Sequence, residues 1–185
     1  MARPTKAAYE AALGILSYLN KTKEYGITYR HGGPRTMEVY CDASFGRDLR
    51  PMAGHFIYMA GAPISWQSKS LKVIPQSSCE AEVAAASNAC KDLAFLRNCL
   101  VDLREPVRLP VVVYTDNKAC RDLADKQGVS ARTKHFNRWL YYIREMRVDG
   151  LIRIGLITTQ MQIADCLTKC LPKTAFLNMR QRLLS

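Results

Sequence analysis

The sequence predicts an α/β fold in which helices cover the faces of a mixed β-sheet. Three strand-like segments follow one another in the first half of the chain, and strands and helices alternate after them. Hydrophobic residues make up 48% of the 185 residues, enough to fill the core of one domain of ordinary size. Consecutive strands followed by alternating strands and helices are typical of a mixed sheet, because each crossover helix must lie on a face of the sheet.

An amphipathic helix is predicted over residues 4–25, where apolar residues recur at helical spacing. A helix of this size cannot bury its apolar face alone, so it belongs to a neighbouring segment or packs on the main domain. The run His-Gly-Gly-Pro at residues 31–34 then breaks the chain. We therefore expect residues 1–34 to form an N-terminal segment and residues 35–185 to form the main domain.

Three strands and a long helix open this main domain. Apolar and polar residues alternate in the first strand, and a Gly-Ala-Pro turn separates the second strand from the third. A helix is predicted from Ser77 to about Leu103, because Ser77 and Glu80 have the spacing of a capping box. The strands are expected at residues 37–42, 53–60 and 64–68.

The second half of the domain alternates between helices and strands. The run Val-Val-Val-Tyr-Thr at residues 111–115 is nearly all apolar, which is typical of a buried strand. Apolar residues recur at helical spacing from Phe136, and Gly150 marks the end of that helix. The other elements are expected to be helices at residues 117–126, 136–147, 160–170 and 173–184 and a strand at residues 151–157.

The composition favours an intracellular protein with a polyanionic partner. There are 27 lysines and arginines against 16 acids, and the net charge of +11 is typical of nucleic-acid binding and compatible with plain solubility. The seven cysteines include no CxxC pair and the N-terminus has no apolar leader, so we expect reduced thiols in the cytoplasm or nucleus. No apolar run is long enough to span a membrane.

Four acidic residues stand out from this framework. Asp42 and Asp116 each close a predicted strand, and ligand sites in α/β sheets lie at the carboxyl ends of strands. Glu82 and Asp165 lie in predicted helices among apolar or small residues, where a charge needs a partner. Four acids brought together favour divalent cations, and oxygen ligands favour Mg²⁺ or Mn²⁺.

Each acid also has a simple structural explanation. Asp42 fits a turn at the end of a strand, Asp116 fits a helix cap, and Asp165 fits a solvated helix acid. Glu80 is better explained by the capping box, so Glu82 is the preferred ligand of that helix. The joint arrangement of the acids, rather than any one of them, favours a metal site.

Six short segments carry a resemblance to a known family. They are VYCDAS at residues 39–44, GAPISW at 61–66, SSCEAE at 77–82, YTDN at 114–117, RTKH at 132–135 and ADCLTK at 164–169. In this order they resemble the ribonuclease H domain of copia-type LTR retrotransposon Pol polyproteins. Residues 8–29 are similar to the tail of the reverse transcriptase that precedes this domain. Two departures are Val83, where the group usually has tyrosine, and the absence of a histidine from the loop at residues 158–162.

The resemblance implies an RNase H fold with strand order 3-2-1-4-5 and endonucleolytic cleavage of the RNA strand of RNA–DNA hybrids. It implies two Mg²⁺ ions, for which Mn²⁺ can substitute. Asp42 would bridge both ions, Glu82 and Asp116 would hold one of them, and Asp165 would help to hold the other. The implied partners are the hybrid and the reverse transcriptase of the same polyprotein, in a cytoplasmic virus-like particle or the nucleus.

Five further residues are candidates for contacts with the hybrid. Ser78 and Asn117 are placed to contact sugar hydroxyls, which distinguish RNA from DNA, and either could equally cap a helix. Arg132, Lys134 and His135 form a cationic cluster before a predicted helix. The cluster favours phosphate binding, because cations do not stabilise the N-terminus of a helix, although a solvated surface patch is the simple alternative.

The sequence is compatible with three functions. The first is a hybrid-specific endoribonuclease, which the four intact acids and the basic charge favour. The second is a catalytically silent RNase H-like module that grips the hybrid or docks on a polymerase, and an unconstrained module of that kind would tend to lose an acid. The third is an integrase or transposase on the same fold, which needs a differently spaced set of acids.

Overall fold

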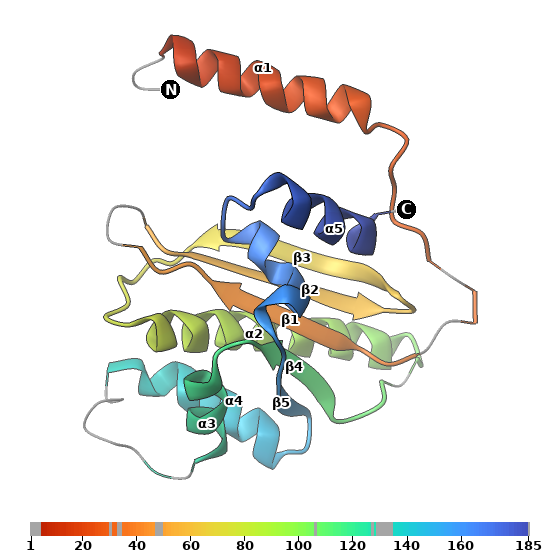
Figure 1. Ribbon diagram of the computed structural model, residues 1–185. Helices are drawn as coiled ribbons and strands as arrows, with labels where there is room; N and C mark the ends of the chain where they lie inside the picture. Colours follow the sequence, from red (N-terminus) through yellow and green to blue (C-terminus); the bar gives the residue numbers. More distant parts are fainter. Residues whose placement is uncertain are drawn as a thin grey trace.

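The computed structural model describes residues 5–29, 31–32, 35–46, 50–105, 107–126, 128 and 135–184. Within these residues a mixed five-stranded sheet has the order β3-β2-β1-β4-β5 (Figure 1). Strands β1 to β3 are antiparallel neighbours, whereas β4 runs parallel to both β1 and β5. The predicted fold class and strand order are therefore confirmed. The strands are β1 (Glu38–Ala43), β2 (Met52–Met59), β3 (Ala62–Ser70), β4 (Val111–Thr115) and β5 (Ile152–Leu156).

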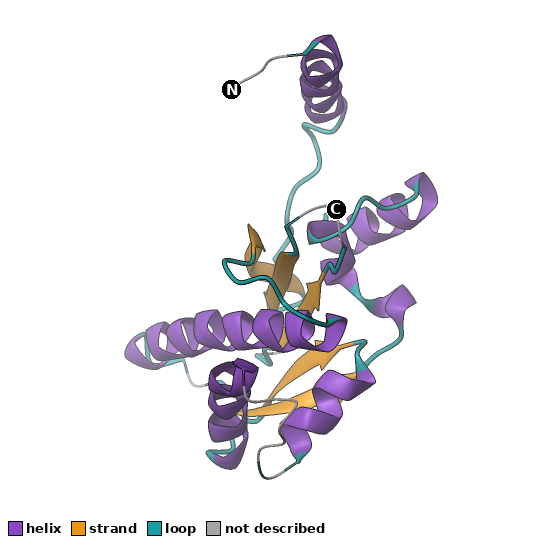
Figure 2. Ribbon diagram, turned by 90° about the vertical axis from the view of Figure 1, so that its left-hand side faces the viewer, coloured by secondary structure: helices purple, strands orange, loops and turns teal. Residues whose placement is uncertain are grey.

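Helices cover both faces of this sheet (Figures 1 and 2). On one face lie α2 (Ser78–Asp102), α3 (Lys118–Asp125) and α4 (Asn137–Val148). On the other face lie α5 (Lys173–Leu183) and two short 3-10 helices, η2 (Thr159–Met161) and η3 (Ile163–Leu167). The first helix of the chain, α1 (Lys6–Lys21), lies outside these two layers.

The main core fills the space between the sheet and helices α2 to α4. Alternate residues of the strands, such as Val39, Cys41 and Ile57, point to this side and are fully buried. They pack on Val83 and Leu93 of α2 in one hydrophobic cluster. The alternation in the sequence therefore identifies the core face of β1, and the core in turn holds α2 in place beside that strand.

The start of α2 forms as the capping residues predict. The Ser77 hydroxyl accepts a hydrogen bond from the backbone N–H of Glu80 at 3.2 Å. The Glu80 carboxylate turns back and accepts one from the backbone N–H of Gln76 at 2.7 Å. Both interactions satisfy backbone N–H donors at the N-terminus of α2. Glu80 is therefore a capping residue, as its spacing from Ser77 indicated.

The predicted helix at residues 160–170 is wrong, because the chain there forms the two 3-10 turns η2 and η3. Gln162, fully buried between them, uses its side chain to bond the backbone. Its Nε2 donates to the carbonyl of Cys41 at 2.9 Å, and its Oε1 accepts from the N–H of Ala164 at 3.3 Å. These bonds anchor the turns to β1 and replace the regular helical pattern.

Close backbone approach also shapes this region. A Cβ atom added to Gly54 of β2 would lie 2.7 Å from Cβ of Leu167 and 2.9 Å from Cγ2 of Thr168. Only a glycine therefore lets η3 rest directly on the strand. The result is that residues at the end of η3 reach across β2 to the carboxyl end of β1.

Helix α1 has no buried residue, and α1 and the segment after it touch the main domain through three tyrosines. The rings of Tyr18 and Phe176 meet edge to face at 5.9 Å, and Arg180 lies 4.6 Å from the ring of Tyr25. The Tyr29 hydroxyl donates to the carbonyl of Pro63 at 2.8 Å. In the described part of the chain no helix combines the length and apolarity needed to cross a membrane.

Candidate active site

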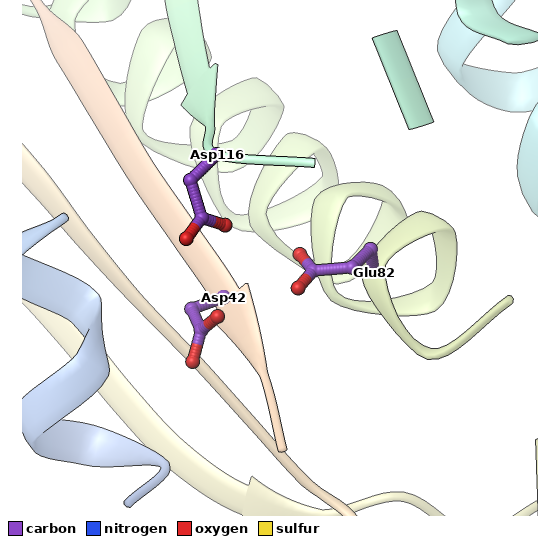
Figure 3. A group of neighbouring side chains, drawn as sticks. All are labelled: Asp42, Glu82 and Asp116. Atoms are coloured by element: carbon purple, nitrogen blue, oxygen red, sulfur yellow. The ribbon is translucent and has the colours of Figure 1, made fainter. Parts of the chain in front are cut away.

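Three carboxylates from distant parts of the sequence converge at one edge of the sheet (Figure 3). Asp42 lies on β1, Asp116 directly follows β4, and Glu82 points toward both from α2. One oxygen of each residue lies within 4.8 Å of the others. Such a group of hard oxygen ligands can hold a divalent cation.

The strand register explains why two of these acids meet. Strands β1 and β4 are parallel, and Tyr40 is paired with Tyr114. Asp42 and Asp116 each lie two residues beyond the paired tyrosines, so they reach the same level on the same face. Asp42 is fully buried and Asp116 is half-buried, which leaves the site open to solvent on the side of β4.

Glu82 has an environment that opposes its negative charge. The residue is 6% exposed, and its Oε2 has no hydrogen-bond partner among the described residues. Burial, together with the charges of Asp42 and Asp116, raises its pKa to about 9. An unpaired buried carboxylate oxygen beside two more acids fits a bound cation, because the cation would supply the missing partner.

The fourth acid, Asp165 of η3, joins the site through a lysine. The Nζ atom of Lys169 lies 3.0 Å from Oδ1 of Asp165 and 3.2 Å from Oδ1 of Asp42. Burial raises the pKa of Asp165, and the charge of Asp42 acts in the same direction. Burial acts to lower the pKa of Lys169, but the attraction of both carboxylates outweighs it and the pKa is raised.

Two threonine hydroxyls orient the acids. Thr168 donates a hydrogen bond to Oδ2 of Asp42, and Thr159 donates one to Oδ2 of Asp116 at 2.9 Å. Thr159, Thr168 and Lys169 were not among the residues predicted to form the site. The spacing in the sequence could have pointed to Thr168 and Lys169, because they follow Asp165 by three and four residues, the spacing of one helical turn. Thr159 carries no such signal, because it comes from a separate turn.

The predicted hybrid-binding residues fall at different places. Asn117 is the N-cap of α3, and its Oδ1 accepts from the N–H of Cys120 at 3.0 Å. Ser78 is exposed at the first position of α2, where the capping is done by Ser77. The imidazole Nε2 of His135 lies 4.0 Å from the Glu80 carboxylate. Arg132 and Lys134 lie outside the described residues.

Comparison with known sequences finds relatives among transposon polyproteins, whereas no family model matches. The chain is 31% identical over 186 residues to the retrovirus-related Pol polyprotein from transposon RE1 of Arabidopsis thaliana, covering 99% of this chain. It is 33% identical over 176 residues to the corresponding polyprotein from transposon TNT 1-94 of Nicotiana tabacum, covering 94% of this chain. The chain spans 13% of the length of each of these relatives.

Comparison with solved structures finds the same fold in ribonucleases H. LC11-RNase H1, solved in complex with an RNA/DNA hybrid, has a TM-score of 0.56 at 18% identity, over 72% of this chain and 94% of that one. RNase H1 from Halobacterium salinarum NRC-1 has a TM-score of 0.51 at 14% identity, with the same coverage. The resemblance read from the motifs is confirmed: over nearly its whole length the chain is homologous to one segment of the retrovirus-related Pol polyproteins of copia-type transposons, and the chain itself has an RNase H fold.

Proposed function

We propose that this chain is a metal-dependent ribonuclease H that cleaves the RNA strand of RNA–DNA hybrids within a retrotransposon Pol polyprotein. The observation that carries the proposal is the meeting of Asp42, Glu82 and Asp116, with a buried Glu82 oxygen left unpaired, in an RNase H fold. The solved complex of a ribonuclease H neighbour with an RNA/DNA hybrid supports the class of substrate.

The acids divide into two overlapping cation positions. Asp42, Glu82 and Asp116 would hold one ion, and Asp165 would join Asp42 in holding a second. Mg²⁺, or Mn²⁺ in its place, would supply activation of a water for attack on the phosphodiester and stabilisation of the leaving oxygen. Hydrolysis in line with the leaving 3′-oxygen would leave 5′-phosphate and 3′-hydroxyl ends.

The surrounding residues keep the carboxylates in place before the substrate arrives. The hydroxyls of Thr168 and Thr159 each bond one oxygen of Asp42 and Asp116, which restricts rotation of these carboxylates. Burial of Asp42 and Glu82 keeps competing water away from the ligand atoms. Preorganised ligands reduce the reorganisation that the reaction requires, which is the main way such a site gains rate.

Contacts with the hybrid are proposed for two groups of residues. Ser78 and Asn117 would contact sugar hydroxyls. Asn117 would do so with its side-chain NH2, because its Oδ1 accepts the hydrogen bond of the helix cap. Arg132, Lys134 and His135 would bind phosphates. The net charge of +11 supports binding of a polyanion of this kind.

The remaining proposals concern the context of the domain. Residues 1–34 would be the tail of the reverse transcriptase and residues 35–185 the ribonuclease H domain. The exposed side chains of Ile15, Leu16 and Leu19 on α1 support docking on the polymerase part of the polyprotein. The protein would then work in a cytoplasmic virus-like particle or in the nucleus.

The test is cleavage of a labelled RNA–DNA hybrid with Mg²⁺ and with EDTA. The Asp116→Asn variant and a single-stranded RNA of the same sequence are the controls. Mg²⁺-dependent cutting of the hybrid alone, lost in the variant, is the expected result. A folded protein that binds the hybrid but does not cut it, even with the polymerase part of the polyprotein added, would be a catalytically silent module instead.

A further inference from the structure

Lys169 contacts two acids of the site from the chain segment that directly follows η3. Its ammonium group lies between two carboxylates, 3.0 Å from Asp165 Oδ1 and 3.2 Å from Asp42 Oδ1. Among the ion pairs of the described residues, only these two involve any of the four acids of the site. The side chain is 39% exposed, so it is held by the carboxylates and also has solvent to move into.

Lys169 contacts the same two carboxylates that would hold the second metal ion, Asp42 and Asp165. A divalent cation held jointly by Asp42 and Asp165 would bind the carboxylate oxygens that the ammonium now contacts. A divalent ion at this position and the Lys169 ammonium would lie close together, would repel each other and would compete for the same two oxygens. The lysine and the second ion therefore exclude each other, whereas the Asp42, Glu82 and Asp116 group stays free for the first.

We propose that the Lys169 ammonium fills the second cation position of the site in the free protein, so that the protein alone binds one divalent ion and a second enters only when Lys169 withdraws. This inference rests on the proposed function, because it assumes that the acids form a metal site. Lys169 is a positioning residue here. It holds Asp165 beside Asp42 while the second ion is absent.

The charges of the site lead to the same order of events. Four carboxylates and one ammonium leave three negative charges when all are ionised, and one divalent ion reduces these to one. A second divalent ion beside Lys169 would make the site positive. With Lys169 withdrawn, two divalent ions balance the four carboxylates. An incoming phosphate adds negative charge and so favours binding of the second ion.

The backbone supports the exchange. Asp165 lies in η3, which Gly54 allows to rest on β2, and Thr168 and Lys169 directly follow this turn. Thr168 bonds the other oxygen of Asp42, so this carboxylate keeps its orientation when the lysine leaves. Only the flexible lysine side chain must move, which costs far less than moving the turn.

The test is a titration of the metal-free protein with Mn²⁺ in the absence of nucleic acid, with bound ions counted by electron paramagnetic resonance and calorimetry. We expect one bound ion in the wild type and in Lys169→Arg, which keeps the positive charge. Lys169→Met should bind two, the second at least tenfold more tightly than in the wild type. The double variant Lys169→Met, Asp165→Asn should return to one.

Two equally tight ions in the wild type would overturn the proposal, and so would a single ion in a folded Lys169→Met variant. If that variant does not fold, acetylation of Lys169 in the wild type, followed by mass spectrometry, gives an independent answer. The acetylation rate should stay constant through the first equivalent of Mn²⁺ and rise at least fivefold as the second ion binds. A rise with the first ion, or no rise with two ions bound, would contradict the exchange.

The titration and the cleavage assay test the two proposals separately. A protein that binds ions in the expected order and leaves the hybrid uncut contradicts the proposed function alone. A protein that cuts the hybrid and binds two ions with Lys169 still in place contradicts the inference about Lys169 alone.

Discussion

Tyr40 of β1 lies beside Tyr114 of β4, with the two rings stacked at a centroid distance of 5.0 Å. The pair marks the level at which the two parallel strands are in register. Asp42 and Asp116 lie one repeat of the strand pattern further on, on the same face as the tyrosines. The register of two buried strands therefore places the two carboxylates side by side, which is the basis of the first prediction.

Asp116→Asn should lower the rate of hybrid cleavage at least about a hundred-fold, because an amide is a poor substitute for a metal-binding carboxylate. Asp116 is half-buried and lies outside the core, so the variant should keep its fold. Single-turnover cleavage, circular dichroism and hybrid binding in EDTA are the measurements. Full activity in this variant would remove Asp116 from the site.

Glu82→Gln should stabilise the metal-free protein at alkaline pH. The pKa of Glu82 is raised by burial, and by Asp42 and Asp116, from 4.5 to about 9. An acid whose pKa is higher in the folded state stabilises the fold fully below pH 4.5. This stabilisation is lost as the pH rises toward 9, because the carboxyl group ionises in the unfolded state but stays protonated in the folded state. The loss at pH 9 is on the order of a few kcal/mol, and glutamine avoids it.

Urea unfolding in EDTA at several pH values between 4.5 and 9 measures this effect. Glu10→Gln is the matched control substitution, because Glu10 is an exposed glutamate on α1. Saturating Mn²⁺ should then stabilise the wild type more than Glu82→Gln, because the ionised carboxylate is a ligand. A pH profile identical in wild type and Glu82→Gln would show that Glu82 is not the destabilising acid.

Gly54→Ala should both destabilise the fold and weaken metal binding. The new methyl group would lie 2.7 Å from Cβ of Leu167, so η3 must move away from β2. Overpacking of this kind costs about 1–3 kcal/mol. The movement would also displace Asp165 and Thr168 from Asp42. Thermal unfolding and Mn²⁺ titration measure the two effects.

Gly46→Ala is the control for this substitution, because nothing lies within 4 Å of the atom added there. It should change neither the stability nor the affinity for Mn²⁺. Unchanged Mn²⁺ affinity in Gly54→Ala would show that the close packing of η3 is not needed to hold the acids together.

Thr159→Val should lower cleavage about tenfold, because Asp116 loses the hydroxyl that orients its Oδ2. Thr159→Ser keeps the hydroxyl and should restore most of the rate. The residue is exposed, so neither change should alter stability by more than about 0.5 kcal/mol. Equal activity in the valine and serine variants would exclude an orienting role for the hydroxyl.

Much of the fold follows from local patterns in the sequence. The alternation at β1, the apolar run at β4 and the capping residues of α2 each identify an element, because they reflect which side chains the backbone can bury or bond nearby. Residues 160–170 are the exception. Their helical pattern is overridden by Gln162, whose partner is the carbonyl of Cys41, more than a hundred residues away.

The acidic residues of the candidate site, and the strand ends at which Asp42 and Asp116 lie, could be predicted from local patterns. The choice of Glu82 over Glu80 could also be predicted, because the capping box accounts for Glu80. The position of Lys169 between Asp42 and Asp165, and the hydrogen bond from Thr159 to Asp116, became visible in the folded chain. The reason is physical: local spacing sets which side chains share one element, whereas contacts between elements depend on how closely η3 packs on β2, and this packing depends on a missing side chain at Gly54.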